Sequence, residues 1–168
     1  MMIKHVTFAL ALAATPAVAQ EKLDLLATTI AGVMDGATVA VGPNATGPAT
    51  RTAAGAYNVG TVEGQAGLTV TEPTECVFEV ALMLALVSTG TIRFDFNLVS
   101  GVSYEALDPM EGLNQFRITL AGEGDIVQFK SPDGEFSTVG PSSTIATSLS
   151  AADLQAAADA LEAACPKP

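Results

Sequence analysis

Two cysteines far apart in the chain constrain the fold more than any other feature of the sequence. Cys76 begins the most apolar of the expected strands, and Cys165 lies near the C-terminus. The chain has no C-x-x-C motif, and two isolated thiols make a poor metal site. A structural disulfide is therefore the simplest role of the pair if the chain is exported to an oxidising compartment. We expect it to tie the end of the chain to the sheet.

A helix is clearly marked just before Cys165. Ser150 is a favoured cap residue, and Asp153 completes a capping box with it, while Leu149 and Leu154 can form a hydrophobic staple. One apolar stripe of this helix includes the cysteine: Leu154, Ala158, Leu161 and Cys165. Because the apolar stripe of a helix packs on the core, the cysteine should face the sheet. This spacing supports the disulfide independently.

The first nineteen residues are typical of a cleaved export signal. Lys4 gives a basic start, residues 6–14 are apolar or small apart from one threonine, and an Ala-x-Ala site ends at Ala19. The apolar run is far shorter than the roughly 20 residues that cross a bilayer. Pro16 argues against the alternative, a buried N-terminal helix. We expect cleavage after Ala19, leaving residues 20–168 as one domain in the periplasm or outside the cell, with no membrane span.

Charge and composition exclude several classes of function. The chain has 7 basic and 18 acidic residues, a formal net charge of −11, which disfavours nucleic-acid binding. The simplest role of this charge is solubility, and a basic partner would be attracted by it. The only histidine, His5, lies in the expected leader. Histidine-dependent nucleophiles and histidine-ligated metals are therefore excluded from the mature chain, and no cofactor is expected.

Periodicity predicts a helix, then strands, then a helix. Apolar residues recur at spacings of three and four in residues 21–35, which predicts a helix that ends at Gly36. Residues 37–66 are rich in Gly, Ala, Thr and Pro, with short strands expected at 38–41 and 51–59. Residues 91–99 alternate as a half-buried strand, with the preceding segment as the expected partner.

The remaining β segments suggest hairpins. Residues 76–87 favour a strand, although a helix from Glu79 onward is the alternative because residues 81–86 are good helix formers. A strand beginning at Phe116 should return through the turn 122–124, and residues 131–134 fit a type I turn. We therefore predict an α+β fold: an antiparallel meander of four to six strands, with the N- and C-terminal helices packed on one face.

Three acidic residues, Glu105, Asp108 and Glu111, lie in what the sequence suggests is an exposed irregular loop. Asp108 followed by Pro109, with Glu111 three positions on, is typical of a helix start. Three carboxylates could alternatively hold Ca²⁺, but no calcium-binding loop motif is present.

The sequence favours binding over catalysis because it lacks catalytic side chains. The leading prediction is an exported envelope protein that binds an unknown protein or small ligand without catalysis. The alternative is a histidine-free hydrolase of cell-wall or other sugars, with Glu75, Glu79 and Asp95 as candidate carboxylates. The chain has no tryptophan to form a sugar platform. Tyr57 and Tyr104 could anchor a partner, although partly buried tyrosines of no special role are the simpler interpretation.

Overall fold

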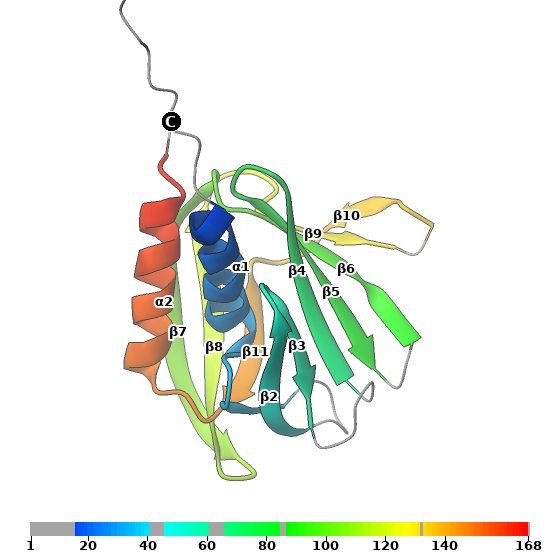
Figure 1. Ribbon diagram of the computed structural model, residues 1–168. Coiled ribbons are helices and arrows are strands. Elements are labelled where there is room, and N and C mark those ends of the chain that lie inside the picture. Colours follow the sequence, from blue (N-terminus) through cyan, green and yellow to red (C-terminus); the bar gives the residue numbers. More distant parts are fainter. Residues whose placement is uncertain (1–15, 41–45, 61–65, 85–86, 132, 168) are drawn as a thin grey trace, which may run out of the picture.

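The computed structural model describes residues 16–40, 46–60, 66–84, 87–131 and 133–167. It confirms an α+β fold with a large curled antiparallel sheet, an N-terminal and a C-terminal helix, and one disulfide (Figure 1). The elements are α1 (Pro16–Ala31), β1 (Thr38–Ala40), β2 (Thr46–Ala53), β3 (Ala56–Val59), β4 (Ala66–Thr74), β5 (Val77–Leu84), β6 (Val87–Asp95), β7 (Val99–Met110), β8 (Leu113–Gly122), β9 (Val127–Lys130), β10 (Phe136–Thr138), β11 (Ser142–Thr147) and α2 (Ala151–Ala164).

The described residues form one sheet of 11 strands in the order β10-β9-β6-β5-β4-β3-β2-β1-β11-β8-β7. The expectation of four to six strands was wrong, in part because one expected strand contains portions of two, β2 and β3. The segment 51–59 turns at Gly55, where φ is 65°. The strand preferred for residues 76–87 is confirmed as β5, which pairs with β6 as expected.

Strands β1 to β6 form a simple meander, but the hairpin expected across residues 122–124 is absent. Strand β8 pairs with β7 and β11, whereas β9 pairs with β6 and β10. Gly122 instead allows two backbone segments to lie close together, because a Cβ at this position would collide with the backbone carbonyl of Leu98. The chain therefore crosses from one half of the curled sheet to the other at this point.

Helix α1 extends from Pro16 to Ala31, so it both begins and ends earlier than the expected 21–35. Pro16 does not break the helix but stands at its first position, where its missing N–H costs no hydrogen bond. Gly32, with φ at 64°, donates its N–H to the carbonyl of Thr28 at 2.9 Å, and Val33 donates to Ala27 at 3.3 Å. The first of these bonds, from a glycine in the left-handed conformation, is the one that closes a glycine-capped helix. The prediction that the helix ends at Gly36 was therefore wrong. Most of the expected leader, residues 1–15, lies outside the described residues.

The C-terminal predictions are confirmed. Ser150 caps α2 and forms the capping box with Asp153, and the stripe of Leu154, Ala158 and Leu161 is fully or almost fully buried. Cys76 and Cys165 form the disulfide, with their Cα atoms 5.6 Å apart.

The two helices lie side by side on one side of the curled sheet (Figure 1). Helix α1 lies within the curl, and α2 lies beside it against β7. The core under the helices includes Phe78 and Phe96, whose rings pack edge to face at 5.8 Å. Thr147 anchors the end of α1 by donating its hydroxyl to the carbonyl of Gly32 at 2.8 Å. The helices cover only part of the inner face.

Candidate functional site

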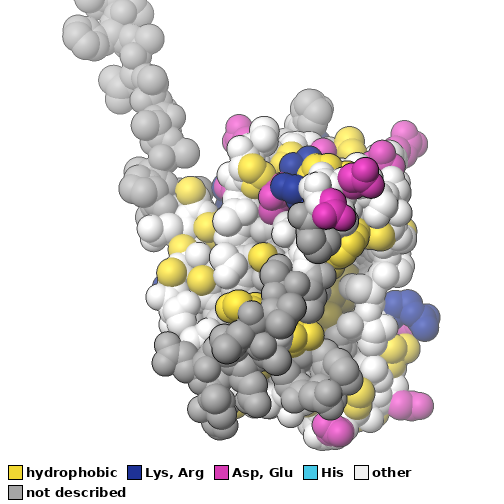
Figure 2. Space-filling view, turned by 90° about the vertical axis from the view of Figure 1, so that its right-hand side faces the viewer, with side chains coloured by type: hydrophobic (Ala, Val, Ile, Leu, Met, Phe, Trp, Pro, Cys, Tyr) yellow, Lys and Arg dark blue, Asp and Glu magenta, His cyan; other side chains and the backbone are white. Residues whose placement is uncertain are grey.

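The uncovered part of the inner face forms a cavity of about 510 Å³. This lies within the roughly 300–1,000 Å³ of small-molecule sites. Residues of β4, β5, β6 and β9 line one side, β8 and β11 line another, and Ile30 and Ala31 close the end at α1. Figure 2 shows a hollow on the molecular face turned toward the viewer, with hydrophobic side chains inside it.

Strand register explains why the lining is apolar. Ile92 on β6 pairs with Val80 on β5 and with Phe129 on β9, and all three line the cavity. Cross-strand partners share one face of a sheet, and alternate residues face the other side. The next residue, Arg93, accordingly lies on the outer face, where it forms an ion pair with Glu79 at 2.6 Å.

Gly90 gives Phe129 the room to line the cavity. A Cβ on Gly90 would lie 2.6 Å from the ring of Phe129, far inside van der Waals contact. Its φ of 114° is also a conformation that residues other than glycine rarely adopt. The space between β6 and β9 therefore depends on this glycine.

None of the described residues that line the cavity carries a charge. The polar side chains among them are the hydroxyls of Ser142, Ser143 and Thr144, which are exposed at the start of β11. The cavity is thus apolar within and weakly polar where β11 begins. Such a lining fits an apolar ligand and offers no acid or base for catalysis.

The volume of the cavity is too large for it to be empty. A sealed, empty void costs roughly 24 cal/mol per Å³. At that rate 510 Å³ would cost about 12 kcal/mol, as much as the whole stability of about 5–15 kcal/mol of a typical domain. The fold tolerates the hollow only if solvent or a ligand occupies it.

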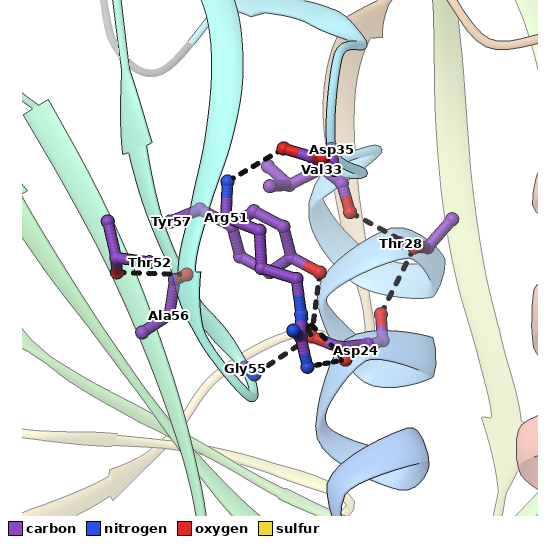
Figure 3. A network of polar contacts seen from close by, with 9 residues as sticks. All are labelled: Asp24, Thr28, Val33, Asp35, Arg51, Thr52, Gly55, Ala56 and Tyr57. Atoms are coloured by element: carbon purple, nitrogen blue, oxygen red, sulfur yellow. Dashed lines mark hydrogen bonds and ion pairs between the residues drawn. The ribbon is translucent and has the colours of Figure 1, made fainter.

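A second feature is a polar network between α1 and the β2–β3 hairpin (Figure 3). The Asp24 carboxylate accepts hydrogen bonds from Tyr57 Oη at 2.7 Å, from Gly55 N–H at 2.9 Å, and from Arg51 Nη2 at 2.8 Å. Asp35 accepts a bond from the Arg51 backbone N–H at 2.9 Å. The network fixes α1 on the hairpin and lines a second hollow on the surface.

The network shifts the titration of its members. Burial acts to raise the pKa of the Asp24 carboxyl, but the hydrogen bonds from Arg51, Gly55 and Tyr57 outweigh this effect and lower it. Burial and the adjacent Asp24 carboxylate raise the pKa of the Tyr57 phenol. Tyr57 therefore remains a neutral donor, and Asp24 a charged acceptor, at neutral pH. We interpret this arrangement as structural, because the Asp24 carboxylate is already bonded to other groups of the protein, Arg51, Gly55 and Tyr57.

The three acidic residues expected in a loop lie elsewhere. Glu105 and Asp108 belong to strand β7, and Glu111 lies in the tight turn before β8, with φ at 50°. The helix start expected at Asp108 is wrong, because residues 99–110 pair with β8. Glu105 forms an exposed ion pair with Arg117 at 2.7 Å. Among the described residues, no three Asp, Glu, His or Cys side chains form a group that could hold a metal ion.

The carboxylates considered for sugar hydrolysis lie outside the cavity. Glu79 is paired with Arg93 on the outer face, and Asp95 accepts the N–H of Asn97 at 3.0 Å in the turn after β6. Glu75 is exposed between β4 and β5. The structure thus brings no two of these three residues together in the hollow.

The two tyrosines are largely internal rather than exposed anchors. Tyr57 is 4% exposed and bonded to Asp24. Tyr104 lies on β7 and donates its hydroxyl to the carbonyl of Thr29 at 2.9 Å, which joins β7 to α1. Burial raises the pKa of the Tyr104 phenol. Both residues therefore hold helix α1 to the sheet.

Sequence reasoning missed the cavity because its lining looks like an ordinary core. The alternation of Ile92 and Phe94 with polar neighbours indicates an apolar inner face, but not whether that face is filled. The start of β11, with three consecutive hydroxyl residues, was the available sign of a change in polarity.

Together, the fold and cavity define a curled-sheet α+β protein with an internal apolar site. Comparison of the chain with protein-family models, with curated proteins and with solved structures found no match. No helix among the described residues is long and apolar enough to cross a membrane.

Proposed function

We propose that this is an exported, non-enzymatic binding protein that holds a small apolar ligand in the cavity of its curled sheet. The observation that carries the proposal is the cavity of about 510 Å³, in which none of the described lining residues carries a charge. The hollow opens to the surface (Figure 2), so an apolar ligand that enters it would displace water and bury its own surface at about 25 cal/mol per Å².

The absence of acid–base groups from the described lining supports binding rather than catalysis. Hydrolysis by carboxylates needs two of them converging on one substrate. The lining instead combines aliphatic and aromatic side chains such as Leu68, Val80 and Phe94 with a few hydroxyls. These groups hold a ligand by shape and by exclusion of water.

Titration with N-phenyl-1-naphthylamine, an uncharged fluorescent apolar probe, tests this proposal. We expect saturable binding at one site per chain. Ile92→Trp replaces an aliphatic side chain of the lining by a bulky indole ring and should weaken probe binding at least tenfold. Thr91→Trp is the matched control, because Thr91 pairs with Ala81 and Lys130 on the outer face. It should bind as the unmodified protein does.

Ser143→Trp provides a second test that spares the core, because Ser143 is exposed at the cavity. Circular dichroism and urea unfolding establish that each variant is folded. Absence of saturable probe binding by the unmodified protein would reject the proposal. Equal binding by folded Ile92→Trp, Ser143→Trp and Thr91→Trp would reject the cavity as the site.

Export is proposed on the N-terminal sequence, from its basic start to the Ala-x-Ala site that ends at Ala19. Expression with the full N-terminus in a bacterial host, followed by fractionation and N-terminal sequencing, should give a periplasmic or secreted chain beginning at Gln20. Retention in the cytoplasm with Met1 intact would contradict export and leave the ligand proposal standing.

A further inference from the structure

We infer that the ligand is an amphiphile with one apolar chain and an uncharged, hydrogen-bonding head group, and that Ser143 receives this head group. The inference rests on the proposed function, because it concerns the occupant of the same cavity.

Polarity within the cavity is confined to one place. All three hydroxyl side chains of the described lining come from the first half of β11, while Ile145, further along that strand, is apolar and buried. A ligand that is apolar along its whole length makes no use of a hydroxyl at this end of the cavity. A ligand with a polar end can bond such a hydroxyl with that end while its chain extends toward Ile145.

Register selects Ser143 from the three hydroxyls. Ser143 pairs with Ile118 of β8, which is 2% exposed and lines the cavity, so the two side chains share the inner face. Ser142 pairs with Thr119 on the outer face, and their hydroxyl oxygens are 3.1 Å apart. In the described part of the chain, Ser143 Oγ has no such hydrogen-bond partner, so it is free to bond a ligand.

The distribution of basic residues argues against an anionic head group. No Lys or Arg is among the described lining residues. Four of the seven basic residues in the chain are already in ion pairs: Lys22 with Glu72, Arg51 with Asp24, Arg93 with Glu79, and Arg117 with Glu105. A ligand carboxylate or phosphate would therefore lose water without gaining a cation. The net charge of −11 adds a long-range repulsion.

No acidic side chain is among the described lining residues either, so nothing there compensates a cationic head group locally. An alcohol or ester head loses less on leaving water and can exchange hydrogen bonds with a serine hydroxyl. The chemistry that fits is thus that of long-chain alcohols and acylglycerols.

Displacement of N-phenyl-1-naphthylamine by 1-decanol and by decanoate tests the inference, since the two have the same number of carbons. At pH 8 the carboxyl is ionised, and we expect 1-decanol to bind at least tenfold more tightly. The preference should persist in 0.5 M salt, because salt screens long-range repulsion but not local desolvation. Each added methylene should tighten alcohol binding about fourfold until the cavity is full.

Two variants locate the head group. Ser143→Ala should weaken 1-decanol binding about twofold to tenfold, which corresponds to the net free energy of one hydrogen bond. Its affinity for the probe should be unchanged. Ser143→Lys supplies a cation and should strengthen decanoate binding at least tenfold. Thr119→Lys, which adds the same charge on the outer face of β8 and outside the cavity lining, is the control and should leave decanoate binding weak.

The outcomes separate this inference from the proposed function. If neither the probe nor 1-decanol binds, both fail. If the probe binds but decanoate matches or exceeds 1-decanol in 0.5 M salt, the uncharged head group is refuted and the apolar site remains. If Ser143→Lys and Thr119→Lys affect decanoate binding equally, the assignment to Ser143 is wrong.

Discussion

Removal of the Asp24 carboxylate should destabilise the protein, because this group is the shared acceptor of the network between α1 and the β2–β3 hairpin. In Asp24→Ala, the buried hydroxyl of Tyr57 and the N–H of the buried Gly55 lose their acceptor. A buried donor without a partner costs about 1–3 kcal/mol, and the two losses are not fully additive. We expect the free energy of unfolding to fall by about 2–4 kcal/mol, which lowers Tm by about 5–15 °C for a domain of this size.

Urea unfolding at pH 7 measures this loss, and Glu21→Ala is a suitable control. Glu21 lies on the same helix and is exposed, so its removal should change stability by no more than about 0.5 kcal/mol. A double-mutant cycle with Tyr57→Phe isolates the bond between Tyr57 Oη and the carboxylate. A loss below about 0.5 kcal/mol in Asp24→Ala would refute the reasoning that the network holds α1 on the hairpin.

The pH dependence supplies an independent check. The pKa of Asp24 is lowered in the folded state, so its contribution is fully present above the unfolded value near 3.9. That contribution is lost as the pH falls through the folded pKa. The unmodified protein should therefore lose stability more steeply below about pH 4 than Asp24→Asn does. Identical slopes for the two proteins would show that Asp24 does not titrate as described.

Three further changes test other parts of the fold. Replacing Cys76 and Cys165 by serine releases a loop closed across 89 residues and should lower stability by up to about 4–5 kcal/mol; thiols that alkylate without reductant would instead mean that no disulfide forms. Thr147→Val removes a hydroxyl bonded to two backbone groups and should cost about 1–3 kcal/mol in urea unfolding, whereas an unchanged midpoint would contradict this. Gly90→Ala should displace the ring of Phe129, costing about 1–3 kcal/mol and weakening probe binding; wild-type stability and affinity would show that the glycine is dispensable.

Local signals in the sequence were sufficient for the C-terminal end of the fold. The capping box at Ser150 depends on residues three positions apart, and the stripe that carries Cys165 depends on helical spacing alone. Neither needs distant contacts, so both could be predicted. The disulfide followed because the partner cysteine was the only other one in the chain.

Predictions that needed a choice between competing local patterns were less secure. Asp108-Pro109 suits a helix start, yet the pairing of β7 with β8 along residues 99–110 overrides that preference. Gly36 suits a helix end, but Gly32 meets Thr147 of β11 so closely that a Cβ would lie 2.8 Å from it. Tertiary contacts decided both positions.

The sequence by itself determined that residues such as Ile92, Phe94 and Ile118 share an inner, apolar face, because a strand alternates with a period of two. It also placed the hydroxyls of β11 together. Only the tertiary structure decided that this face encloses a cavity, because the pairing of β9 with β6 and of β11 with β8 depends on long-range register and curl. Inner faces that meet make a filled core, whereas inner faces held apart by the curl leave a cavity.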